Sequence, residues 1–137
     1  MWWIYALISA TFAAATAILA KIGVTGVNSN VAIAIRTTVV LVMAWGIVLA
    51  SGESGSINLL TRKNILFLVL SGIATGLSWI FYFKALQEGK ASQVAPIDKA
   101  SLVLTILFAA LFLGEPPSWK VLAGASCIVA GTLIIIL

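Results

Sequence analysis

The sequence predicts an all-α integral membrane protein, in which residues 1–137 form a single domain of five transmembrane helices. Five apolar stretches each approach the ~20 residues that a helix needs to cross ~30 Å of hydrocarbon. Hydrophobic residues make up 62% of the chain and charged residues only 9%, a composition that excludes a water-soluble domain of this size. None of the stretches alternates polar and apolar residues, which favours helices over a β-barrel.

The predicted spans follow one another with short connections. They run from Trp2 to Ala20, Val31 to Ala50, Ile65 to Leu86, Ser92 to Leu113 and Trp119 to Leu137. We expect the first to be a retained helix and not a signal peptide, because no basic residue precedes it and no cleavage signal follows. An odd number of spans places the two termini on opposite faces of the membrane.

The connections carry the residues that end and begin helices. Asn28, Ser29 and Asn30 are candidate N-caps for the second span. The Gly/Ser-rich link 51–64 is typical of a flexible surface turn, and Ser118 follows two prolines and can cap the fifth span. Links this short predict antiparallel neighbours in a compact bundle.

The composition also excludes several functions. The net charge is +4, but the basic residues are scattered singly, so no nucleic-acid-binding patch forms. The chain has no histidine, and its one cysteine, Cys127, lies inside an apolar run. Imidazole metal sites and a nucleophile–base pair are therefore excluded, and we expect neither an enzyme nor a bound cofactor.

Three ionisable residues lie inside the predicted spans. Arg36 is about two turns into the second span, and Asp98 and Lys99 are about two turns into the fourth. Both spans begin on the same face, so these charges lie at a similar depth, ~9 Å below the surface. A charge at membrane depth costs roughly 2.5–3.5 kcal/mol on insertion scales, and usually faces a cavity or a partner.

Two interpretations of these charges remain open. Asp98 can pair with Arg36 or Lys99 and simply join the second span to the fourth. Alternatively, the three residues line a polar cavity whose surplus positive charge attracts an anionic group of a substrate. The planar guanidinium of Arg36 suits a carboxylate or phosphate, because it can donate two parallel hydrogen bonds.

Further candidate substrate-binding residues surround these charges. Ser101 shares a helix face with Asp98, and Pro96 just upstream removes a backbone hydrogen bond and loosens the preceding turn. The third span adds polar and aromatic side chains that could line the cavity: Ser78, Trp79, Tyr82 and Phe83.

Two features point to a second subunit. Gly124 and Gly131 lie seven residues apart on nearly one face of the fifth span, where small residues let a second helix approach closely. Packing within one monomer is the alternative. The basic residues near span ends also divide three against three between the two faces: Arg62, Lys63 and Lys120 on one, and Lys21, Lys84 and Lys90 on the other.

Because the basic residues are divided equally between the two faces, the positive-inside rule predicts no single orientation of the chain in the membrane. Copies inserted in opposite orientations would form an antiparallel pair, the two-chain equivalent of the inverted repeat found in many secondary transporters.

Residues 81–137 resemble the second half of an EamA domain of the drug/metabolite transporter superfamily. The resemblance rests on the Y-F-x-A-L pattern at 82–86, the L-G-E at 113–115 and the glycine spacing of the fifth span. Arg36 matches a basic residue common in this family. The resemblance covers essentially the whole chain.

The resemblance implies a multi-pass transporter of the cell (inner) membrane that exports small polar or anionic metabolites, such as amino acids. Typical members carry two such domains, ten spans related as an inverted repeat, so a single domain implies a homodimer working by alternating access. Many members have a proline in the middle of the fourth span, where this chain has Asp98-Lys99-Ala100-Ser101.

Two other functions compete with this one. Small multidrug exporters of lipophilic compounds also dimerise through a glycine-bearing last helix, but they use a glutamate in the first helix, where this chain has no acid. A non-transporting accessory membrane subunit would need its buried charges only for packing.

Overall fold

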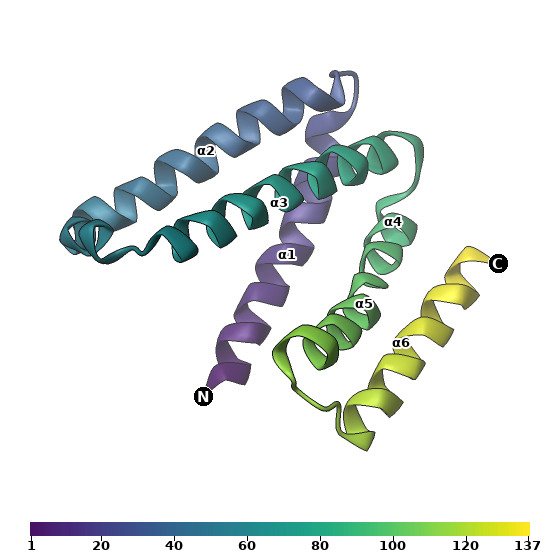
Figure 1. The fold of residues 1–137 in the computed structure, drawn as a ribbon. Helices are drawn as coiled ribbons and strands as arrows, with labels where there is room; N and C mark the ends of the chain where they lie inside the picture. The colour runs from purple at the N-terminus through teal and green to yellow at the C-terminus, as the bar shows by residue number, and fades with distance from the viewer. The chain divides into compact units, whose positions relative to one another are not determined.

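The computed structural model describes all residues from Met1 to Leu137, and every regular element in it is helical. Five helical segments are long and apolar enough to span a membrane, as predicted. They are α1 (Trp2–Val24), α2 (Ser29–Ala50), α3 (Arg62–Glu88), the composite segment Ala91–Leu113 and α6 (Trp119–Ile136). The chain divides into two units, unit 1 (Met1–Ala17 with Glu88–Leu137) and unit 2 (Ile18–Gln87) (Figure 1).

Unit 2 contains the end of α1, together with α2 and α3. The side-chain oxygen of Asn28 caps α2 by accepting a hydrogen bond from the backbone N–H of Asn30 at 2.9 Å. Of the three candidate caps, Asn28 therefore takes this role. α1 continues four residues beyond its predicted end, past Lys21, whose ammonium group donates a hydrogen bond to the carbonyl of Leu86.

The link between α2 and α3 is more regular than a flexible turn. Gly52 adopts a left-handed conformation with φ of 71°, which residues with a Cβ atom rarely adopt. A 3₁₀ segment, η1 (Glu53–Leu59), follows it and ends where Leu60 returns to an extended conformation. α3 then begins three residues earlier than predicted, at Arg62.

Unit 1 contains the fourth span, which is not the single helix 92–113 that the sequence predicts. It consists of α4 (Ala91–Asp98), α5 (Ser101–Phe108) and a π-helical segment, η2 (Ala109–Leu113). Between α4 and α5 the hydrogen bonds tighten to a three-residue spacing, from Ala100 N to Ile97 O at 2.9 Å and from Leu102 N to Lys99 O at 3.0 Å. The tightened turn lies after Pro96, whereas the sequence predicted a loosened turn before it.

The fourth span ends at Gly114, whose φ of 67° is left-handed. The backbone N–H groups of Gly114 and Glu115 both donate to the carbonyl of Ala109, which terminates the helix. Ser118 then caps α6 by accepting a hydrogen bond from the N–H of Val121 at 3.4 Å, as predicted. α4 and α5 both contact α6 within this unit.

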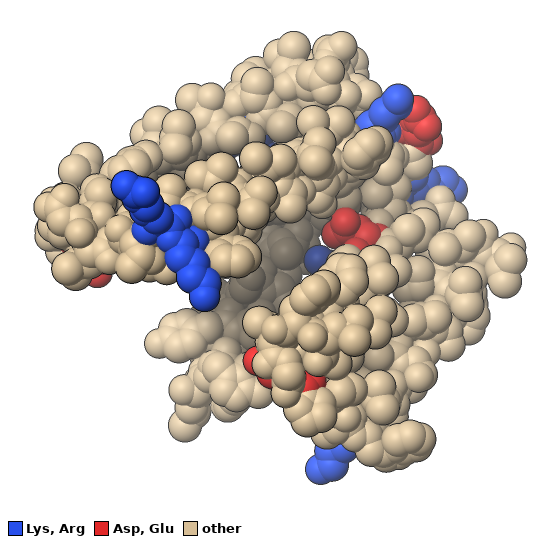
Figure 2. Space-filling model, viewed as in Figure 1, with Lys and Arg blue, Asp and Glu red and all other residues tan.

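Most side chains on these helices are apolar and exposed. Figure 2 accordingly shows only a few basic and acidic residues on a surface that is otherwise uncharged. Such surfaces match hydrocarbon and not water, since helices in a bilayer satisfy their backbone internally and turn apolar side chains to lipid. The chain is therefore a multi-pass membrane protein.

Candidate functional site

Arg36 lies against aromatic rings of α3. Its guanidinium carbon is 4.3 Å from the centroid of the Trp79 ring and 5.4 Å from that of Phe83. The two aromatic residues are four positions apart on α3, so they share one helix face. A cation over an aromatic face is attracted by the ring quadrupole, most strongly over tryptophan. The rings thus stabilise the positive charge of Arg36 inside the span without a carboxylate partner.

The aromatic group extends along α3. The rings of Tyr82 and Phe83 are 6.3 Å apart in an edge-to-face arrangement. Phe83 is 2% exposed, while Arg36 and Trp79 are half-buried. Arg36 is therefore partly accessible, while Phe83, one of its two aromatic neighbours, is fully packed. Of the other candidates on this helix, Ser78 is exposed and Tyr82 is half-buried.

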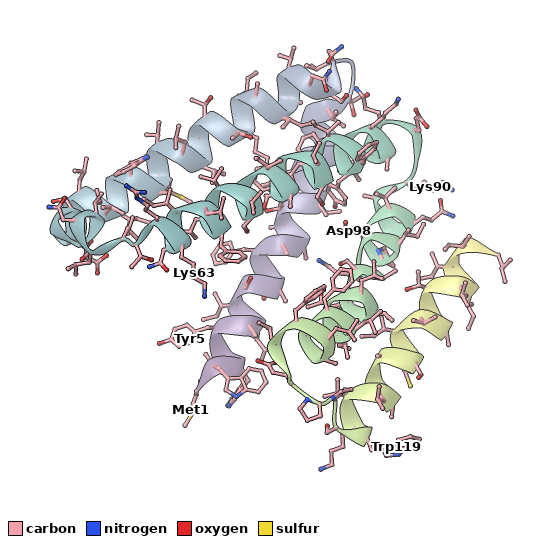
Figure 3. The ribbon with its side chains drawn as sticks, viewed as in Figure 1. Met1, Tyr5, Lys63, Lys90, Asp98 and Trp119 are labelled. Atoms are coloured by element: carbon pink, nitrogen blue, oxygen red, sulfur yellow. The ribbon has the colours of Figure 1, made fainter.

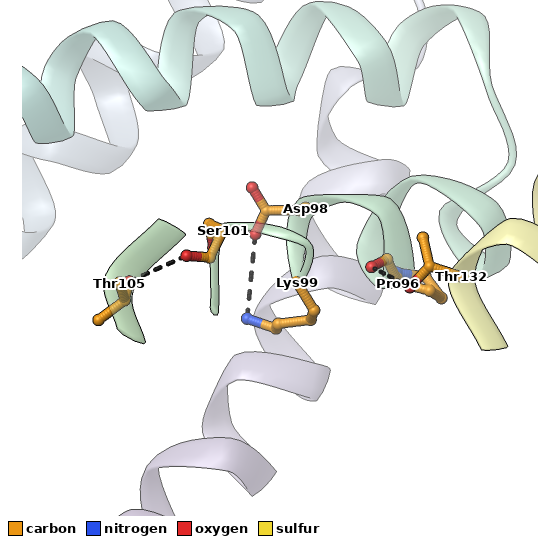
Figure 4. A network of polar contacts seen from close by, with 6 residues as sticks. All are labelled: Pro96, Asp98, Lys99, Ser101, Thr105 and Thr132. Atoms are coloured by element: carbon orange, nitrogen blue, oxygen red, sulfur yellow. Dashed lines mark hydrogen bonds and ion pairs between the residues drawn. The ribbon is translucent and has the colours of Figure 1, made fainter. Parts of the chain in front are cut away.

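The candidate residues of the fourth span gather around its interruption. Asp98 is the last residue of α4 and Lys99 follows it, so both lie near the middle of the segment Ala91–Leu113. Their side chains approach to 3.9 Å and are 41% and 56% exposed respectively (Figures 3 and 4). Ser101 begins α5, and its carbonyl accepts a hydrogen bond from the hydroxyl of Thr105 at 2.9 Å.

This ion pair has limited structural value. A pair between neighbouring residues of one span cannot join that span to another, and exposed pairs contribute only about 0–1 kcal/mol. Asp98 and Lys99 are therefore available for polar contacts at an interrupted helix, an arrangement that transporters use to build central sites. A cavity that these residues share with Arg36 remains a prediction.

Thr132 of α6 also contacts the fourth span, and sequence reasoning did not single it out. Its hydroxyl lies 2.8 Å from the carbonyl of Ile128 and 3.5 Å from that of Pro96 (Figure 4). It is the one buried polar residue of the chain, at 7% exposure. A threonine near the end of an apolar helix ordinarily bonds to the carbonyl four residues earlier. The sequence therefore gives no signal that Thr132 also contacts another helix.

The two glycines proposed for a subunit interface lie on open helix surface. A Cβ atom added at Gly124 or Gly131 would meet no other atom within 4 Å. Neither glycine is therefore needed to let another part of the same chain approach closely. The chain also contains no cluster of three or more cysteine, aspartate or glutamate side chains that could hold a metal ion.

Residues 1–137, the whole chain, match the EamA-like transporter family. The protein belongs to this family. The resemblance recognised from the Y-F-x-A-L and L-G-E patterns is thereby confirmed.

Curated relatives of this EamA-like protein agree with the assignment. The chain is 46% identical over 134 residues to a protein of Sinorhizobium sp. named "Uncharacterized transporter in cobO 3'region", covering 98% of the chain and 95% of that relative. It is 35% identical over 68 residues to human "Solute carrier family 35 member G1", covering 50% of the chain but only 19% of the human protein. No solved structure gives a significant match.

The two relatives differ in how much of their own length matches this chain. The Sinorhizobium protein has almost the same length as this chain. The human protein is more than twice as long, since the same 68 residues are 50% of this chain and 19% of the human protein, and the similarity concerns only that part. The similarity therefore extends over nearly all of the first relative and over about a fifth of the second.

Proposed function

We propose that the protein is a secondary transporter that exports small polar or anionic metabolites, such as amino acids, across the cell (inner) membrane. One observation carries the anionic preference: Arg36 lies over Trp79 at 4.3 Å and makes no ion pair within unit 2. An aromatic ring stabilises a cation without occupying the N–H edge of the guanidinium. That edge is left to bind a carboxylate or phosphate in two parallel hydrogen bonds.

The interrupted fourth span supports transport as the mechanism. A helix broken near its middle leaves backbone groups and polar side chains where a continuous helix would present none. Asp98, Lys99 and Ser101 all lie at this break. We assign these three residues contacts with polar groups of the substrate, and we assign such contacts separately to Ser78 and Tyr82 of α3.

The direct test is uptake into liposomes containing the purified protein. The panel comprises radiolabelled L-glutamate and succinate as anions, L-leucine as a zwitterion and tetraphenylphosphonium as a lipophilic cation. We expect the anions to be carried, and Arg36→Ala to reduce their uptake about 10- to 100-fold, the value of a charge-assisted bidentate contact. Arg36→Lys should recover only a part, since an ammonium lacks the planar fork.

Lys84→Ala is the matched control, because Lys84 is an exposed basic residue near the end of α3. It should leave uptake unchanged. Transport of tetraphenylphosphonium but of no anion would contradict the proposal and favour a small multidrug exporter. Unaltered anion uptake by Arg36→Ala would remove Arg36 from the site.

We further propose an antiparallel homodimer with α6 at the interface. The balanced basic residues and the open surface at Gly124 and Gly131 support it. Small residues allow helices to approach closely where lipid provides no hydrophobic drive for association. Gly124→Leu with Gly131→Leu should convert the dimer to a monomer in detergent, as measured by light scattering, whereas Ala125→Leu should not.

A further inference from the structure

Two hydrogen bonds fasten the end of α1, and the connection that follows it, to the end of α3. The ammonium group of Lys21 donates to the backbone carbonyl of Leu86. In the opposite direction, the side-chain amide of Gln87 donates to the carbonyl of Val27 at 2.6 Å. Both bonds lie within unit 2 and join residues 60 or more positions apart.

Each bond satisfies a backbone carbonyl that has no hydrogen-bond partner within a helix. Leu86 is in the last turn of α3, where carbonyl groups have no partner in the helix. A cation is also favoured there, because the C-terminus of a helix carries partial negative charge. Val27 lies in the connection between α1 and α2, outside both helices.

The tightest packing of unit 2 lies beside these bonds. Leu86 is 0% exposed, Val24 1% and Phe83 2%, and Ala20 completes the group at 9%. By contrast, α2 and η1 contain no buried residue, and neither does the first half of α3. Unit 2 is therefore closed at the end where α1 finishes, α2 begins and α3 finishes, and open elsewhere.

The closed end is connected to Arg36 through Phe83. Phe83 is one helical turn from Leu86 and Gln87 on α3 and contacts the guanidinium at 5.4 Å. A shift of the end of α3 would therefore move Phe83 and, one turn further on, Trp79. The position of the cation thus depends on how the ends of α1 and α3 are fastened.

We propose that Lys21 and Gln87 form a latch that closes this end of unit 2 beside Arg36 and opens during the transport cycle. The proposal rests on the transport function given above. Two side-chain donors at the end of a span can exchange their carbonyl partners for water, so the latch opens without unfolding the helices. Whether a substrate can pass inward or outward at this end of unit 2 then depends on the opening of the latch, which also frees Phe83 and Arg36.

The first experiment needs no substrate. Val24→Cys in a Cys127→Ser background places one thiol at a site that is 1% exposed, and a charged maleimide in nanodiscs labels it only when the latch opens. Lys21→Met and Gln87→Leu should each speed labelling about tenfold, the effect of losing one such hydrogen bond. Lys21→Arg keeps a donor and should stay slow, as should the control Lys84→Met.

Equal labelling rates in Lys21→Met, Gln87→Leu and the unaltered background would overturn the latch. Faster labelling in Lys84→Met as well would also overturn it, since that result reports a general loosening of the bundle. Because no substrate enters this measurement, its outcome does not depend on whether the panel anions are transported.

The second experiment distinguishes a moving latch from a fixed brace. Val27→Cys with Gln87→Cys, again without Cys127, allows a disulfide to hold the two segments together. Oxidised protein in liposomes should lose uptake of whichever panel anion the parent carries, and dithiothreitol should restore it. Full uptake by the oxidised protein would show that transport does not require this end to open, which would overturn the latch. If the parent carries no panel anion, the transport function fails and the labelling experiment alone decides the latch.

Discussion

Replacing Trp79 tests whether the aromatic face of α3 holds Arg36 in its binding position. The guanidinium carbon lies 4.3 Å from the ring centroid, well inside the ~6 Å over which cation–π attraction acts. Such contacts contribute about 0.5–1 kcal/mol at exposed sites and about 2 when desolvated. Since Arg36 is half-buried, Trp79→Leu should remove about 1–1.5 kcal/mol of this support.

The expected kinetic effect follows from that energy. If the ring only positions the cation, KM for the transported anion should rise about five- to tenfold while the maximal rate changes little. Proteoliposome uptake over a range of anion concentrations measures both constants. The control is Trp45→Leu, because Trp45 lies on α2 and is 50% exposed. It should leave both constants unchanged.

A double-mutant cycle separates the contact from the loss of ring volume. Trp79→Leu also leaves space in the bundle, which lowers stability whatever Arg36 does. Thermal unfolding of Trp79→Leu, Arg36→Met and the double variant should give a coupling of about 1 kcal/mol. A coupling below about 0.3 kcal/mol, within the usual additivity of independent sites, would refute the role of the ring.

Three further outcomes can be measured. Cysteines at Ser54 and Gly89, on either side of α3, should react with an impermeant reagent from opposite membrane faces in any one molecule, and labelling from one face only would remove the five-span topology. Asp98→Asn should uncouple anion transport from an imposed pH gradient but permit exchange, because the amide cannot carry the proton; unchanged coupling would exclude Asp98 as the proton carrier. Adding two or three lysines to the link 51–64 should fix all copies in one orientation and abolish transport, and coexpression of a copy with extra lysines near Lys90 should restore it. Full activity of the singly fixed protein would rule out the antiparallel dimer.

Much of the architecture could be read from local sequence alone. The spans are set by apolar length, and their starts by side-chain oxygens at Asn28 and Ser118, which act on neighbouring backbone groups. Because these interactions join residues only a few positions apart, they can be predicted from the local sequence. The family could likewise be recognised from short patterns around α3, the end of the fourth span and α6.

The sequence by itself therefore determined a five-span EamA-like membrane domain and the residues available for a polar site. Tertiary structure decided how those residues are used. It placed Arg36 of α2 over Trp79 of α3, and it joined Lys21 to Leu86 across more than 60 positions. The physical reason is that a guanidinium or ammonium finds its partner among groups that packing brings near, and lipid-exposed helices leave no periodic pattern that fixes which faces meet.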